Sequence, residues 1–140
     1  MMADFACALI VKSRRLLLGQ RSAHRRNRAG KWDVIGGQAE AGEDLHSALT
    51  RELAEEVGIV PLSQRYFATI EQTATNSCFH YFVVDRWEGT PAIQNQEHSR
   101  LLWYSFSDAA QLPDLALAEY PDLFRQLARF SSGADPSSLG

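Results

Sequence analysis

The chain has 140 residues and a formal net charge of −3, and 45% of its residues are hydrophobic. This length is typical of one domain, and a domain of this size buries roughly two thirds of the surface of its unfolded chain. The net charge excludes a basic nucleic-acid-binding arm as a description of the whole chain, and no apolar run approaches the roughly 20 residues that a membrane helix needs.

The N-terminal part of the chain predicts a hairpin, a basic loop and a short strand. Residues 4–11 and 16–21 are apolar and favour β-structure, and the residues between them are typical of a turn. Residues 22–30 carry several arginines without a periodic pattern, which indicates a loop. Residues 31–35 predict a strand that leads into two glycines.

One amphipathic helix is predicted from Asp44 to Val57. Its apolar residues recur every four positions and form one stripe: Leu45, Leu49, Leu53 and Val57. Asp44 suits the N-cap position, because its carboxylate can accept a hydrogen bond from a free backbone N–H of the first turn. Gly58 suits the position just past the C-terminus, where a left-handed backbone is common.

The remaining segments predict more strands and two helices. Strands are expected over 65–74, 78–87 and 101–106. Ser107 is expected to cap a short helical stretch toward Leu112, and a last helix is expected over Leu117–Phe130. Because strands outnumber helices and one strong helix lies in the middle, we expect a single α/β domain with a mixed sheet covered by helices.

Cysteine usage and the N-terminal residues indicate a cytoplasmic protein. Cys7 and Cys78 lie far apart, which is not a disulfide framework, and each is expected to be a buried free thiol. The first apolar run is too short for a signal peptide and is followed at once by charged residues. We expect the domain to cover residues 1–131 and the polar residues 132–140 to form a disordered tail.

Three acidic residues share one face of the predicted helix, beside its apolar stripe. Glu52, Glu55 and Glu56 stand at i, i+3 and i+4. Glu52 and Glu56 repel each other at this spacing by roughly 0.2–0.5 kcal/mol, and negative charge near a helix C-terminus also opposes the macrodipole. Such violations of local rules concentrate at functional sites.

A divalent cation would compensate for this repulsion. Carboxylates without His or Cys are hard oxygen ligands, which suit Mg²⁺ or Mn²⁺, and Mg²⁺ commonly also binds substrate phosphates. Arg51 could hold one carboxylate in place, either Glu55 at i+4 or Glu43 upstream. The pair Gly36-Gly37 suits a positive φ, a close approach to a ligand or an ordinary turn. A solvated acidic face is the alternative interpretation of the helix.

The segment from Gly37 to Ile59 resembles the Nudix box, G-x5-E-x7-R-E-U-x-E-E-x-G-U, in which U is an aliphatic residue. Every defined position of the motif is filled, by Gly37, Glu43, Arg51, Glu52, Leu53, Glu55, Glu56, Gly58 and Ile59. The order of hairpin, basic loop, helix, strands and terminal helix is also similar to a whole Nudix domain. Ile35 stands where many members carry Pro, a departure that bears on subfamily and not on activity.

The resemblance implies a Nudix fold, which is an α/β/α sandwich around a mixed sheet. It also implies Mg²⁺-dependent hydrolysis of a nucleoside diphosphate linked to another group, with Mn²⁺ as a substitute cation. By the family pattern, the metal ligands would be Gly37, through its backbone carbonyl, Glu52, Glu55 and Glu56. Glu43, Arg51 and Gly58 would support the geometry of the loop and the helix.

The attacking water must lose a proton, and the sequence leaves its acceptor open. Glu52 or Glu55 of the helix is one choice. Glu97 is the other, because it lies in a polar loop before a predicted strand, and in similar MutT-like sequences an acid in this region comes near the metal. His98 is adjacent and could assist. The expected catalytic group is therefore Glu52, Glu55 and Glu97, with Arg51 beside them.

Basic residues precede the acidic ones along the chain. Eight of the fourteen Lys and Arg lie from Lys12 to Lys31, and this suits an anionic substrate held against a cation, although a solvated basic loop has the same composition. Phosphate contacts could come from Arg21, Arg25, Arg26, Arg28 and Lys31, and the substrate contacts expected first are those of Arg21, Arg26, Lys31 and Trp32. Other aromatic residues could stack a base but are more often core residues: Phe82, Trp87, Trp103 and Tyr104.

The best-supported function is that of a MutT-like nucleoside triphosphate pyrophosphatase, which acts on a dNTP or an oxidised nucleotide by attack of water at phosphorus. The alternatives are a nucleotide-sugar or ADP-ribose-type pyrophosphatase and a non-catalytic Nudix-fold nucleotide-binding module. Binding modules typically lose box acids, and this chain has lost none. We expect a small nucleoside diphosphate derivative as partner, with no nucleic-acid polymer and no membrane. Homodimers are common among similar proteins, although no residue here indicates one.

Overall fold

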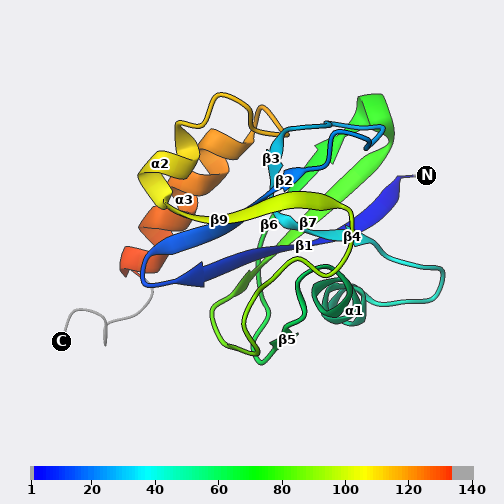
Figure 1. Cartoon of the computed structure of the whole chain (residues 1–140), viewed down its shortest axis with the longest axis horizontal. Coiled ribbons are helices and arrows are strands. Elements are labelled where there is room, and N and C mark those ends of the chain that lie inside the picture. The colour runs from blue at the N-terminus through cyan, green and yellow to red at the C-terminus, as the bar shows by residue number, and fades with distance from the viewer. Residues whose placement is uncertain (1, 134–140) are drawn as a thin grey trace.

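The computed structural model describes the backbone of residues 2–133 (Figure 1). Its strands are β1 (Ala3–Lys12), β2 (Arg15–Arg21), β3 (Trp32–Asp33), β4 (Ile35–Gln38), β5 (Val60–Pro61), β6 (Arg65–Gln72), β7 (Ser77–Val84), β8 (Trp87–Glu88) and β9 (His98–Ser105). Its helices are α1 (Leu45–Val57), α2 (Phe106–Ala110) and α3 (Tyr120–Gly133), with a 3₁₀ turn over Thr73–Thr75. Within these residues no helix has the length and apolar character needed to cross a membrane.

The main sheet is mixed, as predicted, and β1 is its central strand. β1 pairs in parallel with β7, from Ala3↔Ser77 to Ile10↔Val84. Its other edge pairs antiparallel with β4 near the N-terminal end and with β2 at the C-terminal end. β2 also pairs with β3 and β9, and β6 pairs with β7. A separate two-stranded sheet joins β5 to β8.

Helices cover both faces of the sheet, so the predicted α/β/α sandwich is confirmed (Figure 1). Alternate residues of a strand point to opposite faces. Cys7 and Leu9 of β1 therefore join a core with α2 and α3, whereas Ala8 and Ile10 join a second core with α1. Both layers of side chains are buried, and this double burial explains the continuous apolar run of β1.

The predicted helix and its two ends are confirmed. Leu49, Leu53 and Val57 are fully buried against the sheet, and full burial of such a side chain contributes about 1.5–3 kcal/mol. The carboxylate of Asp44 accepts a hydrogen bond from the backbone N–H of Ser47 at 2.8 Å. Gly58 ends the helix in the left-handed conformation, with φ of 71°. The packing of α1 thus fixes the orientation of its acidic face.

The strand predicted over 31–35 is wrong in its extent. Trp32–Asp33 pairs with β2, whereas Ile35–Gln38 pairs with β1, so the chain changes partners at Val34. Gly36 and Gly37 lie inside β4 and not in a turn, and neither has a positive φ. Pattern alone missed this, because one short apolar run serves two neighbouring strands.

Several other predicted boundaries shift. The strand expected over 78–87 ends at Val84, and Trp87 belongs to β8. Ser105, not Ser107, caps α2, because its hydroxyl accepts a hydrogen bond from the backbone N–H of Asp108 at 3.1 Å. The last helix begins at Tyr120, since the residues from Leu117 form a turn before it. α3 continues to Gly133, two residues into the expected tail, and residues 134–140 lie outside the described part of the chain.

Candidate active site

Arg51 joins the loop before α1 to the acidic face of the helix. Its Nε and Nη2 donate hydrogen bonds to the two carboxylate oxygens of Glu43, each at 2.9 Å. Nη2 also donates to the backbone carbonyl of Gln38 at 3.2 Å, and Nη1 donates to Glu52 at 2.8 Å. The planar guanidinium therefore connects β4, the loop and the helix, which is the geometry expected of a supporting residue.

The pKa values of this pair follow from the contact. The hydrogen bond from Arg51, helped by one from the backbone N–H of Glu40, lowers the pKa of Glu43 to about 2. The hydrogen bond to Glu43 in turn raises the pKa of Arg51. Both groups therefore carry their charge at neutral pH, and the loop is held against the helix by a pair of opposite charges.

Three carboxylates meet at the C-terminal half of α1. Glu52, Glu56 and Glu97 each place an oxygen within 4.8 Å of the others. Glu52 and Glu56 come from the helix, whereas Glu97 comes from the loop immediately before β9. We call these three residues the carboxylate cluster. From the sequence, Glu97 was expected near the metal only through the resemblance to MutT-like proteins. In the structure it lies beside Glu52 and Glu56.

Glu55 lies outside the carboxylate cluster, although it shares the helix with two of its members. Its side chain is 56% exposed, and its carboxylate lies 3.4 Å from Nη1 of Arg51. The role of Glu55 as a metal ligand stays a prediction. Helical spacing gave the correct face but could not distinguish a carboxylate turned toward the cluster from one turned toward Arg51.

Glu56 is the most deeply buried acid of the cluster. Its Oε1 shares a hydrogen bond of 3.0 Å with Nε2 of His98, and both side chains are less than 5% exposed. Its Oε2 is buried and has no hydrogen-bond partner within the described residues. Burial, together with the nearby carboxyls of Glu52 and Glu97, raises the pKa of Glu56 far above its ordinary value. Without a cation, this carboxyl holds a proton.

Glycines make room for these side chains. A Cβ atom on Gly19 of β2 would lie 2.6 Å from Nδ1 of His98, so the imidazole ring packs directly on the backbone there. A Cβ atom on Gly37 would overlap the carboxyl group of Glu52, and one on Gly36 would overlap the backbone of β1. The close approach predicted for the glycine pair is therefore made to the protein itself.

The loop that carries Glu97 is fastened at both ends. The backbone N–H of Gln94 donates to the carbonyl of Glu56 at 3.0 Å, which ties the loop to the end of α1. The hydroxyl of Ser22 donates to the carbonyl of Gln96 at 2.6 Å, and the backbone N–H of Ser22 donates to the carbonyl of Glu97 at 3.0 Å. Sequence reasoning missed Ser22, because nothing local marks a serine that binds a loop more than 70 residues away.

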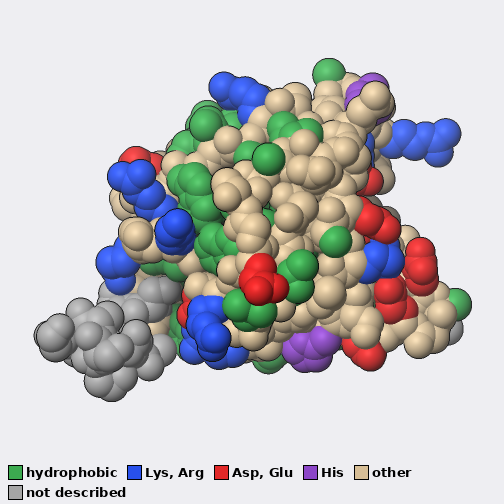
Figure 2. Space-filling view, turned by 60° about the horizontal axis from the view of Figure 1, so that its bottom comes forward, with side chains coloured by type: hydrophobic (Ala, Val, Ile, Leu, Met, Phe, Trp, Pro, Cys, Tyr) green, Lys and Arg blue, Asp and Glu red, His purple; other side chains and the backbone are tan. Residues whose placement is uncertain are grey.

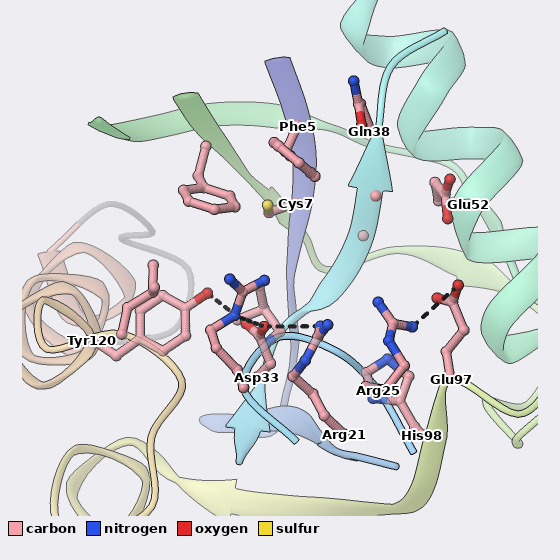
Figure 3. A pocket seen from close by; sticks show the side chains of 16 residues that line it. Phe5, Cys7, Arg21, Arg25, Asp33, Gln38, Glu52, Glu97, His98 and Tyr120 are labelled. Carbon is pink, nitrogen blue, oxygen red and sulfur yellow. Dashed lines mark hydrogen bonds and ion pairs between the residues drawn. The ribbon is translucent and has the colours of Figure 1, made fainter. Parts of the chain in front are cut away.

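Arg25 makes an ion pair with Glu97 at 3.2 Å (Figure 3). Partial burial acts to raise the pKa of Glu97, but the neighbouring Glu56 and the charge of Arg25 outweigh it, and the pKa is lowered. Glu97 is therefore ionised at neutral pH while Glu56 is protonated. Two carboxyls of one cluster thus hold opposite protonation states, a pattern typical of acid–base sites.

A cavity of about 260 Å³ opens beside the carboxylate cluster (Figure 3). Glu52, Glu97 and His98 line one end of it. Tyr120 lies across the cavity from Glu52 and Glu97 (Figure 3), and Phe5 and Phe79 also belong to the lining. The cavity thus combines acidic, basic and aromatic side chains, which suits a ligand with a charged part and an aromatic part.

Asp33 organises the buried polar wall of this cavity. Its Oδ1 accepts hydrogen bonds from the hydroxyl of Tyr120 at 2.6 Å and the backbone N–H of Val34 at 2.8 Å. Its Oδ2 lies 3.5 Å from Arg21 and 3.8 Å from Arg28. The side chain is 10% exposed, so this acid is compensated by two cations and fixed in orientation.

The predicted substrate contacts are only partly supported. Arg21 lines the cavity, but its guanidinium is 9% exposed and already binds Asp33 and the carbonyl of Asn27. Arg26 and Lys31 are exposed side chains that do not line this cavity in the described structure. Trp32 is 5% exposed and packs edge-on against Tyr104 in the core. Arg26, Lys31 and Trp32 thus lie outside the lining of this cavity, and their contact with substrate stays a prediction.

Two other basic residues of the loop, Arg25 and Arg28, line the cavity. Arg28 lies 5.8 Å from the ring of Phe79, and its buried Nε has no hydrogen-bond partner among the described residues. Arg28 adopts a positive φ of 55°, which is uncommon for a residue other than glycine. Position in an irregular loop gives no period from which sequence could choose among five basic residues.

The donor set of the cluster fits a hard divalent cation. All three side chains offer carboxylate oxygens, and one buried oxygen of Glu56 lacks any other partner. A cation at this point would also remove the repulsion between acids that the helix would otherwise keep. Acidic side chains gather at one end of the face that carries α1, with a basic side chain among them (Figure 2).

Comparisons with known proteins agree with this site. The family model of the NUDIX domain matches residues 2–127. CTP pyrophosphohydrolase of Escherichia coli (strain K12) is 35% identical over 122 residues, which are 86% of this chain and 87% of that protein. NAD-capped RNA hydrolase NudC of Vibrio atlanticus (strain LGP32) is 32% identical over 114 residues, which are 80% of this chain but 40% of that protein.

A solved structure extends the comparison to the whole fold. The crystal structure of MutT NUDIX hydrolase from Burkholderia pseudomallei matches with a TM-score of 0.79 at 23% identity, and covers 91% of this chain and 98% of that one. The family model spans nearly the whole described chain, and two residues of the box, Gly37 and Glu52, line the cavity. The chain therefore belongs to the NUDIX family and is a MutT-like Nudix hydrolase.

Proposed function

We propose that this Nudix hydrolase is a nucleoside triphosphate pyrophosphohydrolase that requires Mg²⁺, or Mn²⁺ in its place. The observation that carries the proposal is the convergence of Glu52, Glu56 and Glu97 within 4.8 Å beside a cavity that aromatic side chains also line. The phosphates would lie at the acidic end beside the cation, and the base would lie among the aromatic side chains.

The cation would be held by the carboxylate cluster, with the backbone carbonyl of Gly37 and the carboxylate of Glu55 as the further ligands expected from the family. When bound, Mg²⁺ neutralises phosphate charge and makes a bound water more acidic. Glu56 would give up its proton on binding, and His98 would keep hold of Oε1 so that Oε2 faces the cluster. Arg51 would position Glu52 through its 2.8 Å hydrogen bond and touch no reacting atom.

Glu97 is the best-placed acceptor for the proton of the attacking water. It is ionised at neutral pH, its side chain is 41% exposed, and it lines the cavity beside Glu52. Glu52 and Glu55 remain the alternative acceptors, but Glu52 already accepts a hydrogen bond from Arg51. Water would attack the α- or β-phosphorus, the P–O bond of the anhydride between these two phosphates would break, and the water proton would pass to the carboxylate, so that a nucleoside monophosphate and pyrophosphate would be released.

Arg25 and Arg28 are the cations placed to bind substrate. Arg25 pairs with Glu97 at the mouth of the cluster, where a phosphate could take over the guanidinium. The buried Nε of Arg28 lies 3.8 Å from Oδ2 of Asp33 but has no hydrogen-bond partner in the described chain, so it offers a donor inside the cavity. Phe5 and Phe79, with ring centroids 4.9 Å apart, offer an apolar wall for a base.

The size of the cavity favours one nucleoside over two. Its volume of about 260 Å³ lies below the roughly 300–1,000 Å³ typical of drug-sized ligand sites. A single base and sugar would fill it, whereas a dinucleotide such as NAD would leave one half outside. CTP and dCTP are the first substrates to test, since a relative that this chain matches along most of its length is named a CTP pyrophosphohydrolase.

The experiment is a substrate panel with the purified chain and Mg²⁺ or Mn²⁺. CTP, dCTP, the other nucleoside triphosphates, oxidised nucleotides, ADP-ribose and NAD are incubated with wild type and Glu52→Gln, and pyrophosphate, phosphate and nucleoside monophosphate are measured. The proposal predicts pyrophosphate and a nucleoside monophosphate from a triphosphate, with loss of turnover in the variant.

Other outcomes would change the proposal. Faster cleavage of ADP-ribose or a nucleotide-sugar than of any triphosphate would support the alternative pyrophosphatase. Turnover that is equal in the variant, or independent of the cation, would overturn the assigned site. A small-molecule partner and a homodimer stay predictions, and the second is checked by the molar mass of the chain in solution.

A further inference from the structure

A second group of metal-ligating side chains lies outside the carboxylate cluster. Asp4 of β1 and Cys78 and His80 of β7 each place one potential ligand atom within 4.8 Å of the others. The parallel pairing of the two strands produces this arrangement, because Asp4 lies opposite Cys78 and the residue two positions on lies opposite His80. All three side chains point to the same face of the sheet.

This face is the one that carries α1, whereas the active-site cavity is lined by the alternate residues Phe5 and Cys7. The group therefore lies on the opposite face of β1 from the side chains of Phe5 and Cys7. None of its three residues lines the cavity in the described structure, and none has a role in the proposed hydrolysis. An activity that depends on Glu52, Glu56 and Glu97 does not explain why these residues meet.

His80 is already held in a fixed orientation. Its Nε2 lies 2.9 Å from Oδ1 of Asp4, and its Nδ1 lies 3.3 Å from the hydroxyl of Thr69 on β6. That hydroxyl also contacts the hydroxyl of Tyr66 at 2.7 Å. A metal-binding histidine usually uses its other ring nitrogen in such a hydrogen bond, which sets its tautomer and its angle.

We propose that Asp4, Cys78 and His80 form a second metal site, which binds Zn²⁺ or a similar borderline-soft divalent cation. Ligand bonds of about 2.0–2.3 Å in a tetrahedron place neighbouring ligand atoms roughly 3.2–3.6 Å apart. The 2.9 Å between the Asp4 and His80 atoms is already near this spacing, and the 4.8 Å limit leaves only a small side-chain movement to close the site.

The donor types distinguish this site from the carboxylate cluster. A thiolate, an imidazole and a carboxylate are the ligand set of zinc sites, whereas carboxylates alone suit Mg²⁺. Cys78 is 8% exposed, whereas the side chains of His80 and Asp4 are 19% and 57% exposed. A cation could therefore enter from solvent, with the thiol at the base of the site.

Acidic side chains lie close to Cys78. Burial, then the charges of Glu71 and Asp4, raises the pKa of this thiol. Zn²⁺ would bind the sulfur and displace the thiol proton, and the carboxylates would attract the metal. Glu71 lies directly opposite Cys78 on β6, where it could supply a fourth ligand or bind a zinc-bound water.

The competing interpretation is a simple Asp4–His80 ion pair above a buried thiol. It predicts no selective affinity for a thiophilic metal and no involvement of Cys78. The metal site would instead link β1 to β7. The backbone carbonyl of Asp4 accepts a hydrogen bond from the N–H of Ala39, so the site would also be connected to the start of the loop before α1. Metal binding is therefore expected to stabilise the fold, because the ligands meet only in the folded chain.

The test uses Co²⁺ as a spectroscopic substitute for Zn²⁺, with excess Mg²⁺ present to occupy the carboxylate cluster. The full-length chain is titrated with Co²⁺ and the thiolate-to-cobalt charge-transfer absorption is recorded, followed by Zn²⁺ competition and measurement of metal per chain. Cys78→Ser is the decisive variant, and Cys7→Ser is its matched control, since Cys7 is the other buried free cysteine. Circular dichroism without metal checks that each variant folds.

The site predicts the absorption band in wild type and Cys7→Ser, its loss in Cys78→Ser, and one Zn²⁺ per chain at the competing site. Asp4→Asn and His80→Gln should each weaken Zn²⁺ binding by more than the roughly 10–100-fold typical of losing an outer hydrogen-bond partner. No band in wild type, a band that survives Cys78→Ser, or binding only at millimolar Zn²⁺ would each overturn the proposal. Hydrolysis by Cys78→Ser should match wild type, and this separates the site from the proposed function.

Discussion

Gly19→Ala is predicted to disturb the cluster from a distance, through His98. The new methyl group would lie 2.6 Å from Nδ1 and 2.9 Å from Cγ of the imidazole. The ring is 95% buried and cannot turn into solvent without leaving Glu56. The substitution therefore forces a choice between a strained strand and a broken His98–Glu56 hydrogen bond.

The expected loss of stability can be bounded from these contacts. Overpacking a tight site costs about 1–3 kcal/mol, and losing a buried hydrogen bond costs about 0.5–1.5 kcal/mol more. Alanine recovers about 0.5–1 kcal/mol, because glycine loses more conformational freedom when a strand forms. The net decrease in the free energy of unfolding should be about 0.5–4 kcal/mol.

The assay is urea unfolding followed by circular dichroism for wild type, Gly19→Ala, His98→Ala and the double variant. If the methyl group acts through the ring, the double variant should lose at least about 1 kcal/mol less than the sum of the two single losses, because the methyl then occupies vacated space. Additive losses, or a Gly19→Ala variant as stable as wild type, would refute this reasoning.

Three further predictions concern the supporting residues. Arg51→Lys should lower the free energy of unfolding by about 1 kcal/mol in urea melts, since an ammonium group cannot bind Glu43, Glu52 and a backbone carbonyl together. The folded-state pKa of Glu43 is lowered from 4.5 to about 2, so its stabilising effect is complete above pH 4.5 and is lost toward pH 2. The difference in melting temperature between wild type and Glu43→Gln should therefore shrink as the pH falls over that range. A constant difference would contradict the Glu43–Arg51 ion pair as the source of the stabilisation. Glu97→Gln should lower kcat by roughly 10²–10⁴-fold in steady-state assays, with its melting temperature unchanged. An unchanged kcat would indicate that Glu52 or Glu55 of α1 accepts the proton instead.

The fold was largely predictable because its main signals are local. The four-residue stripe from Leu45 to Val57 and the end signals at Asp44 and Gly58 are properties of one helix, and the structure has all of them. The break at Val34 was not predictable in the same way. A run of five residues that serves two strands has no local signal to show where its partner changes.

The candidate site shows the same division. Glu52, Glu56 and Arg51 were found from spacing on one helix, which fixes their relation to each other. Ser22 was missed as a site residue, because its position depends on pairing with a distant segment. Arg25 and Arg28 were considered for phosphate contacts, but a loop without a period could not distinguish them from the other basic residues.

The aromatic side chains divide similarly. Phe5 and Phe79 meet in the cavity because β1 and β7 run in parallel at that register, a relation visible only after folding. Trp32 was expected to contact substrate, whereas its burial in the core follows from its pairing with β2 and its contact with Tyr104.

The central claim is that the carboxylate cluster binds the divalent cation on which hydrolysis depends. The most direct test is calorimetric titration of Mn²⁺ into wild type and Glu56→Gln, with turnover measured on the same samples. Glu88→Gln is the control, because it removes one exposed acid on strand β8. We predict that Glu56→Gln loses at least about tenfold in both Mn²⁺ affinity and turnover, while Glu88→Gln matches wild type. Wild-type affinity and turnover in a folded Glu56→Gln variant would contradict the account.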